Sequence, residues 1–232
     1  MEIIITDLTR FHGNKVCIAG INPETYECIR PMPYIPVSTC KEKNILPGSR
    51  LKGNFIPLPN LKAPHTEDKK HNNLKLFSPC TSEEFYNLLS RTEEESIADG
   101  FEIELKTGQK HIPIETPPDH SIITIQVDPK SVSFVENQFK PGEVKMHFTD
   151  RSGLRFQYMP INDFGYYNYM QSNGTGSFIF EINPFIQKQN EVFFRIGLTR
   201  EHPIKDKKGF WIQVNGIYTF PDCNDDIRCY NR

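Results

Sequence analysis

The chain has 232 residues, of which 37% are hydrophobic and 24% are charged, and its formal net charge is −2. This length allows one or two domains with buried cores, and 17 phenylalanines and 9 tyrosines supply bulky core material, which excludes a disordered tail. The balanced charge argues against a strongly basic, histone-like binder but is compatible with a local basic face.

No run of about 20 apolar residues appears, so we expect no membrane-spanning helix and no membrane partner. The first residues lack the basic region of a signal peptide. The six cysteines show no C-x₂-C spacing, and several interrupt apolar runs as small buried residues do. We therefore expect a reduced, cytoplasmic protein without a disulfide framework, and the sequence indicates no cofactor and no metal site.

Short β-branched or alternating runs, separated by turn residues, predict strands in the first part of the chain. They cover residues 3–6, 15–19, 26–30 and 49–56. Residues 57–73 are rich in Pro, Asn, Lys and His and are predicted to form a long connection. The 18 prolines fit many short elements, because proline is excluded from helix interiors and central strands.

One helical region is predicted at about 81–99. Thr81 and Glu84 form a capping box in front of the apolar positions at 85–89. Thr92 and the acids at 93–95 repeat this signature, and Gly100 ends the segment. We interpret the acids as helix-start residues that complement the helix dipole rather than as a functional patch. The proline-rich residues 111–119 then predict a boundary between a module at 1–118 and a module at 119–232.

Strands are predicted again at 122–127, 131–135, 143–149, 154–158, 178–182, 192–199 and 210–214. Residues 150–153 form a hairpin turn, and the Gly-rich residues 173–177 are predicted to form a flexible hairpin loop. The aromatic residues at 164–170 suit core or interdomain packing, or base stacking. Around the 150–153 turn, alternation puts an apolar set on one face and a mildly basic set on the other. The apolar set is Met146, Phe148, Leu154, Phe156 and Tyr158, and the other is Lys145, His147, Arg155 and Gln157.

A short internal echo links the two ends of the chain. Residues 8–12 read Leu-Thr-Arg-Phe-His and residues 198–202 read Leu-Thr-Arg-Glu-His. Each follows an apolar strand and precedes a second strand that ends in Gly-Ile, at Gly20 and at Gly216. The echo therefore predicts a duplicated strand–turn–strand unit. His12 and His202 occupy equivalent places in it, either as turn residues or as a paired catalytic or ligand-binding couple.

The second copy offers a candidate binding face. Trp211, Gln213 and Asn215 share one side of their strand, while its other side is apolar and reads as core. An aromatic plate with amides and neighbouring cations suits single-stranded nucleic acid, and the alternative is a half-buried Trp packed against another domain. The remaining candidates are Arg195, Arg200, Lys205, Lys207 and Lys208, with Arg30 and Tyr34 in the first module.

Several of these stretches resemble the dual OB-containing domain family, a bacterial and archaeal family with two tandem OB-like barrels. The similar residues are those at 17–21, 29–31, 197–200 and, most closely, 211–222. The resemblance implies two OB-like or small β-barrel modules and nucleic-acid binding, as an accessory in phage-conflict or nucleic-acid-processing systems. Residues 40–190 show no residue-by-residue match.

The first hypothesis is therefore a mainly β protein, with two OB-like modules and a short helical insert, that binds single-stranded or structured DNA or RNA without catalysis. The second is a protein-interaction adaptor that docks a partner protein. The third is an enzyme acting on a nucleotide ligand, but no phosphate loop, dinucleotide fingerprint or nucleophile elbow appears. Its candidate residues would be Asp7, Arg10, His12, Arg200, His202 and Asp222.

Overall fold

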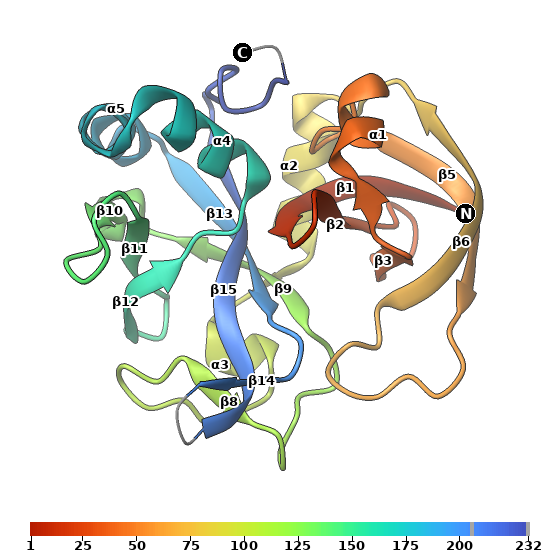
Figure 1. The fold of residues 1–232 in the computed structure, drawn as a ribbon, viewed down its shortest axis with the longest axis horizontal. Coiled ribbons are helices and arrows are strands. Elements are labelled where there is room, and N and C mark those ends of the chain that lie inside the picture. Colours follow the sequence, from red (N-terminus) through yellow and green to blue (C-terminus); the bar gives the residue numbers. More distant parts are fainter. Residues whose placement is uncertain (205–206, 231–232) are drawn as a thin grey trace.

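The structure is a computed structural model that describes residues 1–204 and 207–230. It is mainly β, with 42% strand and 20% helix, as the strand pattern predicts. Its strands form a six-stranded sheet in the N-terminal part, a second six-stranded sheet and a three-stranded sheet (Figure 1). No helix in the described part of the chain is long and apolar enough to cross a membrane.

The N-terminal sheet closes into a ring of five strands, in the order β1-β5-β6-β3-β2, because β2 also pairs with β1. The short β4 pairs with β2 and leads into α1. The ring interior holds an apolar core that includes Ile3, Ile5, Val16 and Ile29. The bounds are β1 (Glu2–Phe11), β2 (Lys15–Ile21), β3 (Cys28–Met32), β4 (Ile35–Pro36), α1 (Val37–Glu42), β5 (Arg50–Pro57) and β6 (Asp68–Phe77).

Strand β6 corrects the expected long connection at 57–73, since it begins at Asp68. It has few apolar residues, but Leu74 and Leu76 alternate along it and pack against the ring core. Its polar positions are possible because β6 exposes much of its length while it bridges β5 and β3. Because the segment is so polar, its sequence did not predict the strand that closes the ring.

The second large sheet has the order β14-β15-β13-β9-β7, and β8 pairs with β15. Strands β7 and β8 come before residue 118 but join strands that follow it. The bounds are β7 (Glu93–Glu94), β8 (His111–Pro113), β9 (Ile122–Val127), β13 (Glu191–Leu198), β14 (His202–Ile204) and β15 (Lys207–Phe220).

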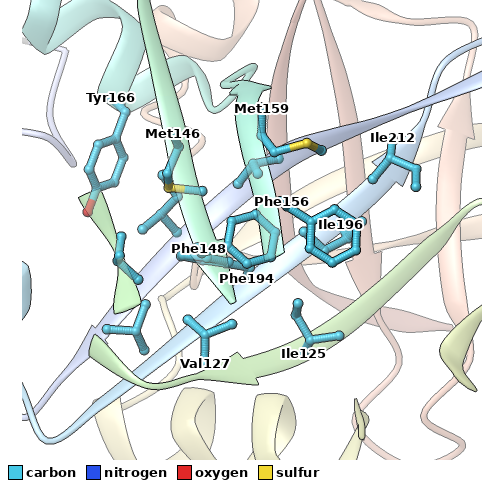
Figure 2. Packing of buried hydrophobic residues seen from close by; sticks show 14 of the residues in the cluster. Ile125, Val127, Met146, Phe148, Phe156, Met159, Tyr166, Phe194, Ile196 and Ile212 are labelled. Atoms are coloured by element: carbon cyan, nitrogen blue, oxygen red, sulfur yellow. The ribbon is translucent and has the colours of Figure 1, made fainter. Parts of the chain in front are cut away.

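The three-stranded sheet lies against this second sheet and consists of β10 (Ser133–Glu136), β11 (Val144–Thr149) and β12 (Arg155–Pro160), after the 3₁₀ turn Pro129–Ser131. Figure 2 shows apolar side chains of β9, β13 and β15 meeting those of β11 and β12. Phe148 packs edge-on against Phe194, with ring centroids 5.1 Å apart, and stacks on Phe156 at 5.2 Å. This inter-sheet layer is the largest apolar core that the described residues form.

The helical insert is α2 (Ser82–Arg91), followed by α3 (Ile97–Gly100). The capping box of Thr81 and Glu84 is confirmed, because each side chain bonds the other residue's backbone amide. The second expected helix start at Thr92 is wrong. Thr92 ends α2, Glu93–Glu94 forms β7, and Ser96 caps α3 by accepting the amide of Asp99.

The expected strand at 178–182 is also wrong, because it lies within a helix. Helix α4 (Phe164–Asn173) is followed at once by α5 (Thr175–Gln187), so residues 173–177 join two helices and form no hairpin loop. The buried residues of α5 are Phe178, Ile182 and Ile186, four apart, which is helical and not strand periodicity. The β-branched and aromatic content of the segment hid this spacing. These two helices add to the one helical region that the sequence predicts at about 81–99.

The hairpin of β11 and β12 is confirmed around the turn at 150–153, but one member of its apolar set changes face. Met146, Phe148 and Phe156 are buried as expected. Tyr158 has φ 51° at an irregularity of the pairing, so Met159 takes the buried position instead. The Tyr158 ring packs against His147 on the basic face, with centroids 4.6 Å apart.

Candidate functional site

Both segments of the internal echo form the predicted strand–turn–strand unit. Strand β1 pairs antiparallel with β2, placing Ile5 opposite Gly20, and β13 pairs antiparallel with β15, placing Arg195 opposite Gly216. Each ladder has one irregularity beside that pair. In Figure 1, β1 runs from the N-terminus toward the β13–β15 pair in the middle of the molecule. The equivalent ends of the two units therefore come close together.

The two echoed segments line one open cleft of about 510 Å³. Five of the predicted nucleic-acid-binding residues contribute to it, from both ends of the chain. The lining includes the predicted residues Arg30, Tyr34, Arg200, Gln213 and Asn215, and the echoed residues Arg10, His12 and His202. The structure thus brings together residues that the sequence placed in two separate modules.

One side of the cleft carries two arginines joined by a buried acid. Asp68 accepts the Nε of Arg30 at 2.5 Å through Oδ1 and the Nη2 of Arg200 at 2.8 Å through Oδ2. Arg200 also donates to the hydroxyl of Tyr34, at 3.1 Å from Nε and 3.0 Å from Nη2. Arg30 is buried, whereas the side chain of Arg200 is 38% exposed. Asp68 and Tyr34 therefore hold Arg200 with part of its guanidinium open to a ligand.

Arg10 supplies a cation from the other echoed segment. Its guanidinium carbon lies 3.9 Å from the ring centroid of Tyr167 on α4, close enough for a cation–π contact. Its backbone amide donates to the carbonyl of Asn162. No carboxylate in the described part of the chain forms an ion pair with Arg10. The aromatic ring orients this charge but does not neutralise it.

A chain of amides crosses the cleft between these cations. Asn162 Nδ2 donates to Gln213 Oε1 at 2.5 Å, and Gln213 Nε2 donates to Asn215 Oδ1 at 2.9 Å. Asn215 is buried because Gly197 leaves space for it. A Cβ on Gly197 would lie 2.0 Å from Asn215 Nδ2. Gly197 therefore permits the placement of the whole amide chain.

Two further polar groups complete the floor. Thr9 and Cys17 are cross-strand partners on β1 and β2, and both line the cleft. Thr9 is 4% exposed, and its hydroxyl has no hydrogen-bond partner in the described part of the chain. Burial raises the pKa of the Cys17 thiol to about 11, so it stays protonated at neutral pH. The floor thus offers an unused hydroxyl beside a neutral thiol.

Trp211 lies at the edge of the cleft rather than in it. Its strand alternates as predicted, with Phe210, Ile212 and Val214 buried on the opposite side. The indole Nε1 donates to the carbonyl of His202 at 3.2 Å, and the ring packs on His111 with centroids 4.9 Å apart. The Trp211 ring is therefore partly covered by the protein itself.

The next predicted binding residues are Lys205, Lys207 and Lys208. Lys207 is exposed, and Lys208 forms an ion pair with Glu201 at 2.6 Å. Lys205 lies outside the described residues. Neither Lys207 nor Lys208 lines the cleft.

Arg195 requires a correction, because the sequence interpretation put it near the exposed face. It is 1% exposed, and its Nε bonds the carboxylate of Asp7 at 2.9 Å. Its other nitrogens donate to the Thr124 hydroxyl at 2.7 Å and to the Cys28 sulfur at 3.3 Å. Arg195 falls at the irregular pair opposite Gly216 and points between the sheets. Its buried ion pair joins β13 to β1 instead of facing a ligand.

The basic face of β11 and β12 approaches the same region. Lys110 contacts the carbonyl of Tyr158 at 3.4 Å, and its own carbonyl accepts the amide of Ile212, next to Trp211. A smaller cavity of about 190 Å³ is bordered by Lys140, Lys145, Asn162 and Arg10. Since Arg10 and Asn162 also line the main cleft, the two cavities are neighbours. The cations around 145 and those around 200 therefore lie on one connected surface.

The sequence interpretation missed Phe11 and Asn162 and left Arg10 and His12 to the enzyme hypothesis. Phe11 packs against Tyr34 with ring centroids 4.5 Å apart. Phe11 is the one position at which the two echoed segments differ, so a comparison of the segments draws attention to it. Nothing in the local pattern distinguishes Asn162. Of the remaining enzyme candidates, Asp7 is engaged by Arg195, and Asp222 follows the far end of β15 and does not line the cleft.

No family model, no curated protein and no solved structure matches this chain. The resemblance to the dual OB-containing domain family therefore stays a prediction from the residues that carry it.

Proposed function

We propose that this protein is a non-catalytic nucleic-acid-binding module that holds a single-stranded segment of DNA or RNA in the cleft between its two echoed hairpins. The observation that supports this proposal is the composition of the cleft lining. Among the described residues its lining includes three arginines and one acid, Glu201, which Lys208 already binds, while Asp68 beside the lining pairs with Arg30 and Arg200 and leaves Arg10 without an acidic partner. Phosphate groups need such cations, and bases need the rings and amides beside them.

The architecture supports the same proposal. Under this proposal, the ring of five strands would be an OB-like barrel, and the second sheet with β10–β12 would be the second module of the expected pair. Small closed β-barrels with Greek-key connections commonly bind oligonucleotides on a strand face and its loops. Here the ligand would lie across the end of β1–β2 and the end of β13–β15, with Lys140 beyond Arg10 to continue the phosphate track, while Lys145 in the same cavity is paired with Glu143 at 3.1 Å.

The test is fluorescence anisotropy with labelled 12-nucleotide DNA and RNA strands over a range of salt concentrations. We expect log K to fall linearly with log salt, by about 0.7 per phosphate contact for a single strand. Arg200→Gln should lower the affinity about tenfold or more, because a hydrogen bond to a charged group contributes about 1.5–3 kcal/mol. Lys75→Gln is the matched control, since Lys75 is an exposed cation on β6 that does not line the cleft.

Trp211→Ala tests the edge of the site in the same assay. With folding intact, loss of one stacking platform should weaken binding by about 1–3 kcal/mol. Tight binding unaffected by both Arg200→Gln and Trp211→Ala would refute the site. No binding of either strand at any salt concentration would refute the function, and co-purification of a defined partner protein would then favour an adaptor.

A further inference from the structure

The internal echo gives the cleft two equivalent cationic arms. Arg10 and Arg200 hold the same place in Leu-Thr-Arg-x-His, and both line the cleft from the ends of paired hairpins. Each guanidinium is oriented by a tyrosine, Arg10 by the ring of Tyr167 and Arg200 by the hydroxyl of Tyr34. Two preoriented arginines on one ligand site indicate a ligand with two anionic groups.

Resting on the proposed function, we infer that the cleft takes one nucleotide unit together with both of its phosphates, the 5′ and the 3′. Arg10 binds one phosphate and Arg200 binds the other. The ligand class of this site is then a nucleoside 3′,5′-bisphosphate unit, which is the repeating unit of a nucleic-acid strand.

The groups between the two arms suit the nucleoside. The amide chain leaves Asn162 Oδ1 and one N–H of Gln213 without a hydrogen bond to the described residues, so the cleft offers one acceptor and one donor. Such a pair is complementary to one edge of a base. The hydroxyl of Thr9 is buried in the floor and has no hydrogen-bond partner among the described residues, which is unusual for a buried polar group.

The dimensions agree with a single unit. A volume of about 510 Å³ lies within the range of roughly 300–1,000 Å³ that is typical of sites for small ligands. Beyond Arg10 the lining continues into the smaller cavity with Lys140 and Lys145. A longer strand would therefore leave the cleft on the Arg10 side.

The experiment is isothermal titration calorimetry with three probes: adenosine 3′,5′-bisphosphate, adenosine 5′-monophosphate and adenosine 3′-monophosphate. The bisphosphate should bind about tenfold tighter than either monophosphate, because it alone engages both arms. In Arg10→Gln, one of the two monophosphates should bind as tightly as the bisphosphate, because only one phosphate still meets an arginine. In Arg200→Gln, the other monophosphate should do so. Lys75→Gln should change none of the three affinities.

Two results would overturn the inference. One is a bisphosphate that binds no tighter than the better monophosphate to the unaltered protein, a comparison that needs no variant to fold. The other is that both arginine variants lose the affinity contributed by the same phosphate. If 12-nucleotide strands bind while the bisphosphate does not, this inference fails and the proposed function stands. If the strands fail to bind as well, the proposed function itself fails.

Discussion

Acid should destabilise this protein through His65 in a way that one substitution can isolate. His65 is 8% exposed, and Arg30 Nη2 lies 3.0 Å from its Nδ1. A guanidinium can only donate, so Nδ1 must be the unprotonated acceptor. Burial, with the charges of Arg30 and Arg200, lowers the pKa of His65 from its ordinary 6.5 to about 3. The folded protein therefore holds this imidazole neutral where the unfolded chain would protonate it.

The sign and size of the effect follow from linkage. Above pH 6.5 both states are neutral and His65 causes no change. As the pH falls below 6.5, only the unfolded state gains the proton, so the free energy of unfolding falls by about 1.4 kcal/mol per pH unit until the folded pKa is reached. The loss relative to pH 7 is about 2 kcal/mol at pH 5 and about 3 kcal/mol at pH 4.

The assay is urea denaturation at several pH values between 7 and 4, on the unaltered protein and on His65→Gln. Glutamine can still accept from Arg30 but does not titrate. Carboxylates contribute equally to both curves, so the difference between the two free energies of unfolding should shrink or reverse in favour of the variant as the pH falls. Parallel curves would refute the assignment of a neutral, buried His65.

Three further predictions concern packing and charge. Arg195→Met should cost about 3–5 kcal/mol of stability in urea denaturation, because it leaves the Asp7 carboxylate buried and unpaired, and adding Asp7→Leu should recover part of that loss. If the double variant is no more stable than Arg195→Met alone, this interpretation of the ion pair is wrong. Gly197→Ala should destabilise by about 1–3 kcal/mol and weaken oligonucleotide binding, since the new Cβ displaces Asn215; unchanged affinity would separate the amide chain from the site. Gly176→Ala is its matched control in α5, where a Cβ meets nothing within 4 Å, and it should raise stability by about 0.5–1 kcal/mol.

Local patterns predicted much of the fold where a segment's own periodicity decides its structure. The alternation at Trp211 and Gln213 and the capping box at Thr81 are of this kind. The pattern failed where tertiary context overrides local preference. Phe178 and its neighbours have strand-like side chains but pack one helix face, and the polar strand β6 is defined by its two partners.

The candidate site shows the same division. The echo correctly indicated that Arg200 and Gln213 belong to a repeated hairpin, and it placed Arg10 in an equivalent position. Sequence spacing carries no information on which hairpin ends meet in space, so the shared cleft could not be predicted. Nor could alternation show that Arg195, at an irregular strand pair, turns toward Asp7, 188 positions away in the chain.

The Asp7–Arg195 pair also restricts how the two copies of the hairpin can diverge. Within the echo, Ile5 stands where the second copy has Arg195, so the arginine is a feature of one copy, and the acid that neutralises it belongs to the other. A substitution that removes either charge leaves the other charge buried without a partner. Only a matching change in the other copy restores a neutral interior. Among relatives of this chain, positions 7 and 195 should therefore change together, as an acid and a base or as two apolar residues, and the two hairpins should evolve as one unit.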